Sequence, residues 1–145
     1  MDQKENPDIG DFAVITSDKL RYCDTDRQGH VNNAVFSSFL ETGRVEILYD
    51  PNKGLASSGC SFVIASLKLD FLGEVNWPGE VQIGSRIGRI GSSSITFEQG
   101  LFQNGTCVAT ALTVIVQVND ATKKAQPLGG LAVASLLRLH AGKSK

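Results

Sequence analysis

The chain has 145 residues, of which 41% are hydrophobic and 20% are charged. This length suits one ordinary domain, because either half alone would be too small to bury a good core. The composition excludes a disordered chain. The net charge of −1 argues against binding nucleic acid through clustered cations, so we expect no nucleic-acid partner.

The cysteines and the apolar runs indicate the compartment. Cys23, Cys60 and Cys107 are odd in number and contain no CxxC pair, so reduced thiols are the simplest interpretation. The longest apolar runs fall short of the roughly 18 residues that a membrane-spanning helix needs. The N-terminus is polar and has no signal-peptide core. We therefore expect a cytoplasmic protein without a membrane partner.

The first half of the chain predicts a strand and then a helix. Residues 1–11 are expected to be a short disordered arm, and 12–22 are compatible with a strand before a polar loop at 23–29. Apolar residues then recur at three- and four-residue spacing over 35–48, which is a helical period. Asn32 or Asn33 would cap this helix. Its polar surface is small, so we expect it to be heavily buried, with Gly43 allowing another element to approach closely.

The second half changes to a period of two. Alternating residues predict four strands, at 60–71, 81–89, 95–102 and 106–118. Turn residues separate them, namely Trp77-Pro78-Gly79, Gly91 to Ser94, and the hairpin signal Asn104-Gly105. In the first of these strands the alternation places Val63, Ala65, Leu67, Leu69 and Phe71 on one face and Phe62 and Ile64 on the other. A short apolar tail over 131–139 predicts a terminal helix.

This order of elements predicts an α+β fold. A five-stranded antiparallel sheet would wrap around the long central helix, with a short C-terminal helix after it. Long strands with apolar residues on both faces and open edges are a liability unless another subunit covers them. We therefore expect a homodimer, or a homotetramer made of two dimers.

The densest polar cluster lies between the first strand and the helix, at residues 24–33. Unpaired backbone N–H groups at a helix N-terminus can polarise a carbonyl, and a carboxylate just upstream can activate water or attack directly. Asp24 and Asp26 are alternatively turn and capping residues. A calcium loop is excluded because its twelfth position is Val35. Cys23, Asp26 and His30 lack a fourth ligand, so we expect no metal.

The run from Arg21 to Asn33, RYCDTDRQGHVNN, resembles the 4-hydroxybenzoyl-CoA thioesterase family of the hotdog-fold superfamily. The resemblance continues with Phe36, Phe39, Glu41 and Arg44 on the helix, and then with Phe71-Leu72, residues 77–80, the turn at 91–94 and the strand to Val118. It covers a hotdog thioesterase domain at 12–128. The arm at 1–11 and a C-terminal helix and tail at 129–145 lie outside it.

The resemblance implies an enzyme that hydrolyses an acyl-CoA thioester to the free acid and CoA. It implies active sites at a dimer interface, with Asp26 as the catalytic carboxylate and the backbone N–H of Asn33 facing the thioester carbonyl. His30, Asn32 and Glu41 are expected neighbours of this site, although Glu41 and Arg44 are alternatively an ion pair along the helix. No cofactor is implied, since the substrate itself carries CoA.

The substrate would contact two further sets of residues. The acyl pocket is expected to be lined by Phe36, Phe39, Leu40, Val63, Ala65 and Leu67. These are all apolar, which favours a neutral acyl or aroyl group over a dicarboxylic one. The candidates for CoA binding are Arg86, Arg89, Ser92, Ser93 and Ser94, although the two arginines have opposite strand parity and should point to opposite faces.

Two other functions stay open at the level of sequence. The fold also serves hydratases and dehydratases that act on acyl thioesters, which usually need a His paired with an acid, and His30 is the only internal His. A non-catalytic dimer that binds acyl-CoA is the third possibility, because a fold alone does not determine activity.

Overall fold

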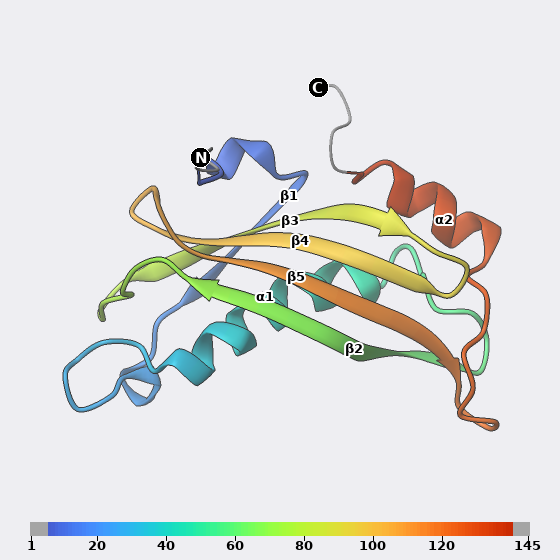
Figure 1. The fold of residues 1–145 in the computed structure, drawn as a ribbon, viewed down its shortest axis with the longest axis horizontal. Coiled ribbons are helices and arrows are strands. Elements are labelled where there is room, and N and C mark those ends of the chain that lie inside the picture. Colours follow the sequence, from blue (N-terminus) through green and yellow to red (C-terminus); the bar gives the residue numbers. More distant parts are fainter. Residues whose placement is uncertain (1–5, 141–145) are drawn as a thin grey trace, which may run out of the picture.

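The computed structural model describes residues 6–140, and an antiparallel sheet in the strand order β1-β3-β4-β5-β2 wraps around one long helix (Figure 1). The helix is α1, and the shorter helix α2 follows the last strand. This confirms the expected hotdog arrangement of five strands, a central helix and a short C-terminal helix. The elements in chain order are η1 Ile9–Asp11, β1 Val14–Lys19, η2 Tyr22–Asp24, α1 Asn33–Leu48, β2 Cys60–Phe71, β3 Glu80–Ile90, β4 Ser94–Gln103, β5 Thr106–Asn119 and α2 Gly130–Leu137.

The helix α1 begins where the sequence predicts. The Asn32 side chain accepts a hydrogen bond from the Ala34 N–H at 3.0 Å, so Asn32 is the N-cap. The buried side of α1 faces the inner side of the sheet. It consists of Phe36, Phe39, Leu40, Gly43, Arg44, Ile47 and Leu48.

Gly43 brings α1 close to β3 and β4. A Cβ built on Gly43 would lie 2.7 Å from Ile83 Cγ2 and 3.0 Å from both Ser85 Oγ and Gln99 Nε2. Any side chain at this position would therefore push the helix away from the sheet. The close approach that the sequence predicts for Gly43 is confirmed.

A β-bulge in β2 changes which of its side chains face the helix. The pairing with β5 is interrupted between Ile64 and Ser66. Ile64 pairs with the buried Ile115, whereas Val63 pairs with Val116 on the outer face. The prediction that Val63 shares a face with Leu67 is thus wrong, because the extra residue at the bulge reverses the alternation. Phe62 and Ile64 face α1 before the bulge, and Leu67, Leu69 and Phe71 face it afterwards.

The strand β2 is an edge of the sheet and is exposed on both faces. On the inner face Ile64 is 52% exposed, Leu67 38% and Phe71 48%, and on the outer face Val63 is 44% exposed. Large apolar side chains in this number, beside an unpaired strand edge, are typical of a surface that another chain covers.

Both ends of the described chain fold back onto the sheet. Phe12 packs on the outer face, where Gly84 and Gly100 leave room for its ring. The short helix η1 just before it, Ile9–Asp11, lies within the segment 1–11 that was expected to be a disordered arm. At the other end α2 packs beside β3, and Ile87 donates a backbone hydrogen bond to the Leu139 carbonyl. The expected helix at 131–139 is therefore found at Gly130–Leu137, and residues 1–5 and 141–145 lie outside the described residues.

Asn104 and Gly105 both have positive φ, 52° and 79°, and join β4 to β5 in the expected hairpin. The three cysteines are free. No helix in the described part of the chain is long and apolar enough to cross a membrane.

The contact at Gly43 leads to a stability prediction. Gly43→Ala should lower the free energy of unfolding by about 1–3 kcal/mol, because the new methyl group overpacks the layer against Ile83. Gly130→Ala is the control, since nothing lies within 4 Å of a Cβ there, and Ala should stabilise α2 by up to about 1 kcal/mol. Urea unfolding of both variants measures this, and a stabilised Gly43→Ala protein would contradict the close packing.

Candidate functional site

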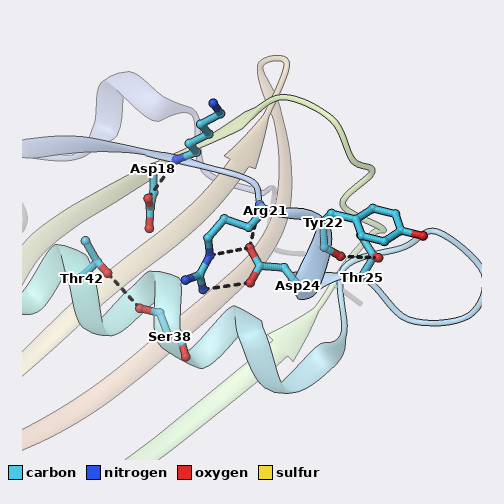
Figure 2. Close-up of polar contacts among 8 residues, drawn as sticks. Asp18, Arg21, Tyr22, Asp24, Thr25, Ser38 and Thr42 are labelled. Carbon is cyan, nitrogen blue, oxygen red and sulfur yellow. Dashed lines mark hydrogen bonds and ion pairs between the residues drawn. The ribbon is translucent and has the colours of Figure 1, made fainter.

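The loop between β1 and α1 is held by Asp24. Its carboxylate is buried and accepts hydrogen bonds from the Arg21 backbone N–H at 2.9 Å and from the Arg21 guanidinium at 3.0 Å. Figure 2 shows these two side chains facing each other beside α1. The hydrogen bond to Asp24 and its negative charge raise the pKa of Arg21. The Asp24 carbonyl also accepts from the Asn32 N–H at 2.8 Å, which ties the loop to the start of α1.

Asp26, two residues later, lies in a different environment. It is exposed, and its Oδ1 accepts hydrogen bonds from the backbone N–H groups of Gln28 at 2.8 Å and His30 at 3.3 Å. Its backbone N–H donates to the His30 carbonyl, which closes the turn. Within residues 6–140 nothing donates to Oδ2. One carboxylate oxygen is thus held by the turn while the other is available to a ligand or to water.

The start of α1 offers hydrogen-bond donors at the same end of the molecule. The Asn32 cap satisfies the Ala34 N–H, but the Asn33 N–H has no acceptor among the described residues. Uncapped donors at a helix N-terminus carry partial positive charge and stabilise a nearby negative oxygen. A carboxylate base and an oxyanion donor are therefore present in one short segment, which is the minimum for acyl transfer.

The segment that follows β2, at residues 74–77, packs against the loop between β1 and α1. Val31 donates to the Val75 carbonyl at 2.8 Å, and His30 Nε2 lies 3.2 Å from an oxygen of Glu74. Two exposed aromatic rings, Tyr22 and Trp77, meet edge to face with their centroids 5.4 Å apart. Glu74 was not expected at this site, because it comes from a segment that only the fold brings to the loop. Tyr22 and Trp77 lie in runs that carry the resemblance, but the contact between them is likewise set by the fold.

A buried cation lies farther along α1. The Arg44 residue is 5% exposed, and its Nη1 donates to Gln99 Oε1 at 3.2 Å. Burial lowers the pKa of this guanidinium, and the charge of Glu41 opposes that shift. Glu41 itself is exposed and makes no ion pair with Arg44 in the described structure. The helix ion pair considered as an alternative is therefore absent there.

The residues expected in the acyl pocket are only partly brought together. Phe36, Phe39 and Leu40 lie in one buried cluster, and the Phe36 ring meets the Phe71 ring with centroids 5.1 Å apart. Leu67 faces the same side, whereas Val63 points to the outer face and Ala65 is the bulge residue. The apolar surface beside α1 therefore includes Ile64 and Phe71 in place of Val63.

The candidates for CoA binding lie at the other end of α1. Arg86 is engaged on the outer face, since its Nε donates to Glu98 at 2.8 Å and its guanidinium lies 5.1 Å from the centre of the Phe12 ring. The turn at 91–94 adjoins Ile90 and Ile95, which pack with Ile47 and Leu48 near the C-terminal end of α1. One protomer therefore does not bring this turn to Asp26.

Arg89 lines an open cavity of about 590 Å³ together with Glu98 and His140. The expectation that Arg86 and Arg89 point to opposite faces is wrong. A bulge between Ile87 and Ile90 places Arg89 beside Glu98, which forms the ion pair with Arg86 on the outer face. Across residues 6–140, no group of three or more His, Cys, Asp or Glu side chains is arranged to hold a metal ion.

Comparison with known proteins defines the class. A family model described as the thioesterase-like superfamily matches residues 20–130, so the chain belongs to this family, and the expected relationship to hotdog-fold thioesterases is confirmed. The fold is similar to that of the PA5185 protein from Pseudomonas aeruginosa strain PAO1, with a TM-score of 0.86 and 24% identity over 95% of this chain and 99% of that one.

Two further solved structures are similar in sequence as well as in fold. A predicted thioesterase from Bacillus stearothermophilus is 27% identical, with a TM-score of 0.80 over 90% of this chain and 98% of that one. A thioesterase from Thermus thermophilus, solved in complex with coenzyme A and Zn, is 28% identical, with a TM-score of 0.75 over 86% and 98% of the two chains.

The different environments of the two aspartates lead to a prediction. Asp24→Asn should lower the free energy of unfolding by about 1.5 kcal/mol, because it weakens charge-assisted hydrogen bonds to a partly exposed arginine. Asp26→Asn should change it by less than about 0.5 kcal/mol, since that carboxylate is exposed. Thermal or urea unfolding compares the two, and an equal loss in both variants would contradict a structural role specific to Asp24.

Proposed function

We propose that this protein is an acyl-CoA thioesterase that hydrolyses the thioester of its substrate to a free acid and CoA. The observation that carries the proposal is the Asp26 carboxylate, held through one oxygen in a turn that leads directly to the uncapped Asn33 N–H. Membership of the thioesterase-like superfamily supports it, as does the similarity to a thioesterase that binds coenzyme A.

In this mechanism the thioester carbonyl oxygen accepts a hydrogen bond from the Asn33 N–H. Asp26 removes a proton from water as the water attacks the carbonyl carbon, or Asp26 attacks the carbon itself and forms a mixed anhydride that water then hydrolyses. In either route the carbon–sulfur bond breaks and CoA leaves as a thiolate, which takes up the proton that Asp26 removed from water in the first route and a proton from water in the second. The acid is then released. One preorganised oxyanion donor contributes about 3–4 kcal/mol to the lowering of the barrier.

We also propose that the working unit is a dimer formed through β2. The free edge of β2 and its exposed inner side chains, Ile64, Leu67 and Phe71, lie beside α1. Covering them with a second copy would remove the open edge and enclose the space next to Asn33. Two dimers could associate further through the outer face of β2 and β5, where Val63 and Leu112 are exposed.

The acyl group would lie along α1, against Phe36, Leu40 and the inner residues of β2. A short acyl chain that ends within this apolar stretch should be neutral, because a carboxylate there would lose its hydration without a partner. Butyryl- or benzoyl-CoA should thus be better substrates than succinyl-CoA. For the nucleotide end of CoA, Arg89 and the turn at 91–94 are the candidates, since Arg86 is engaged by Glu98.

A specific observation also favours a second candidate function. His30 Nε2 lies 3.2 Å from Glu74, and a His paired with an acid is what a hotdog hydratase needs. The two activities give different products. A hydratase would consume the double bond of crotonyl-CoA without releasing a thiol, and a non-catalytic binder would saturate with acyl-CoA and do neither.

The test of catalysis is free-thiol release over a panel of acyl-CoAs. Asp26→Asn should lower kcat by about 10²-fold or more, because general acid–base catalysis contributes about 10²–10⁴. Asp18→Asn is the matched control, since among residues 6–140 the Asp18 carboxylate accepts only a local hydrogen bond from Lys19. An Asp26→Asn protein that folds and keeps more than a tenth of the wild-type kcat would contradict the assignment.

The oligomer has its own test. The chain has a mass of 15.5 kDa, and we expect light scattering to report at least twice this mass at micromolar concentration. Hydrogen exchange should also show protection of the β2 backbone N–H groups that point away from β5, because they would pair with a second chain. A monomer in which the β2 amides that point away from β5 exchange rapidly would rule out a site shared between two subunits.

A further inference from the structure

A buried guanidinium lacks a carboxylate partner in the layer between α1 and the sheet. Arg44 is 5% exposed, and its single hydrogen bond among the described residues goes to the neutral amide of Gln99. Its other nitrogens, Nε and Nη2, have no described acceptor, and they are not fully buried, so they are open to water or to a ligand. The negative charge of Glu41, one helical turn away, acts on Arg44, but the two side chains form no ion pair in the described structure. A buried charge without a direct ion pair is costly, so such groups are normally paired or hydrogen-bonded in full.

The polar surroundings of Arg44 are also incomplete. Gln99 Nε2 donates to the Leu40 carbonyl and to Ser85 Oγ, both at 2.9 Å, so this amide has used both its donors. Thr113 is fully buried, and its hydroxyl is the one buried side-chain polar atom without a partner in the part of the chain that the structure describes. Gln99 pairs with Ala111, two residues before Thr113 on the same face of β5, so the hydroxyl is a diagonal neighbour of Gln99.

Arg44 bonds to Gln99 of β4 and lies on the side of α1 away from β1, toward the half of the sheet that ends in β2. Glu46 accepts a hydrogen bond from Thr16 of β1, so Glu46 lies on the side of α1 that faces β1. Arg44 and Glu46 are about 160° apart around the helix axis, so Arg44 lies on nearly the opposite side. Asn33, Leu40 and Arg44 recur at helical spacing along one flank. The oxyanion donor proposed for the thioester and this cation therefore lie on the same side of α1, beside the exposed inner residues of β2.

The Arg44 guanidinium lies about two helical turns beyond Asn33 along α1. Gln99 binds both the Arg44 guanidinium and the Leu40 carbonyl, so the guanidinium lies near the level of Leu40. Leu40 is seven residues after Asn33, which corresponds to about 10 Å along the helix axis. A short acyl chain held at Asn33 would end before this level, and a medium-length chain would reach it.

We infer that Arg44 is a specificity-determining residue that binds a carboxylate at the far end of a medium-length acyl chain. The inference rests on the proposed thioesterase function and names its substrate class, ω-carboxyacyl-CoA. A carboxylate there would supply the direct ion pair that the described residues do not, through charge-assisted hydrogen bonds. Succinyl-CoA would still be a poor substrate, because its carboxylate would stop within the apolar stretch beside Phe36.

The experiment compares two matched series on the wild-type protein by thiol release: butyryl-, hexanoyl-, octanoyl- and decanoyl-CoA against succinyl-, adipyl-, suberyl- and sebacyl-CoA. We expect kcat/KM to favour the n-acyl substrate in the shortest pair and the ω-carboxy substrate in a longer pair, there by about tenfold or more. If the n-acyl series is hydrolysed and no ω-carboxy substrate is preferred at any length, the inference about Arg44 is wrong while the thioesterase function stands. That result would fit a carboxylate of the partner subunit bound to Arg44. Hydrolysis of neither series would contradict the thioesterase function and the inference with it.

Variants then assign the preference to Arg44. Arg44→Met should lower kcat/KM for the favoured ω-carboxy substrate at least tenfold more than for its n-acyl counterpart, mainly through KM. Arg138→Met, which removes an exposed cation beyond α2, is the control and should leave both series unchanged. An equal loss on both series in a folded Arg44→Met protein would indicate a purely structural arginine. If that variant does not fold, the wild-type comparison still decides the inference.

Discussion

The close approach of α1 to β3 and β4 at Gly43 is the constraint on which the rest of this structure depends. With no side chain at that position, Ile83, Ser85 and Gln99 reach the helix surface. Gln99 can then bond both to the Leu40 carbonyl and to Arg44, so a polar contact forms inside an otherwise apolar layer. The N-terminus of α1 lies at the end of the sheet where β1 ends, because the loop that carries Asp26 joins the two directly.

Two carboxylates two residues apart show how environment separates roles. Asp24 is enclosed and bound by Arg21, so its charge stabilises the loop and is closed to a ligand. Asp26 is bound through one oxygen only, by backbone N–H groups that keep the carboxylate oriented without covering it. Asp24 thus stabilises the loop, and Asp26 in the same loop stays available for chemistry.

The sheet encloses α1 on one side and leaves the other side open. Strand β1 and the C-terminal segment after α2 cover the edge at β3, whereas the edge at β2 and the apolar side chains beside α1 have no cover within residues 6–140. Apolar surface that remains in water contributes nothing to folding, so the single chain leaves part of its hydrophobic stabilisation unused. A site next to this open flank would gain both enclosure and a lower dielectric constant from a second copy.

The sequence by itself determined the elements whose signals are local. The three- and four-residue spacing of apolar side chains, the Asn32 cap and the Asn104-Gly105 turn depend on residues that are close in the chain, and each is found where expected. The glycine at position 43 predicted close packing for the same reason. The segment from Asp24 to Asn33 could be identified as the candidate site because its residue types and spacing lie within one short run.

Tertiary structure decided what depends on pairing between distant segments. The bulges at Ala65 and between Ile87 and Ile90 come from fitting β2 and β3 to their neighbours, and a regular alternation cannot predict an extra residue. Val63 and Arg89 therefore face sides that the pattern did not assign to them. The roles of Asp24, Glu74 and Arg44 were likewise undetermined, because burial and hydrogen-bond partners are set by residues far away in the chain. Arg44 is a surface residue by type, and only the packing of α1 on β4 makes it a buried cation beside the open flank.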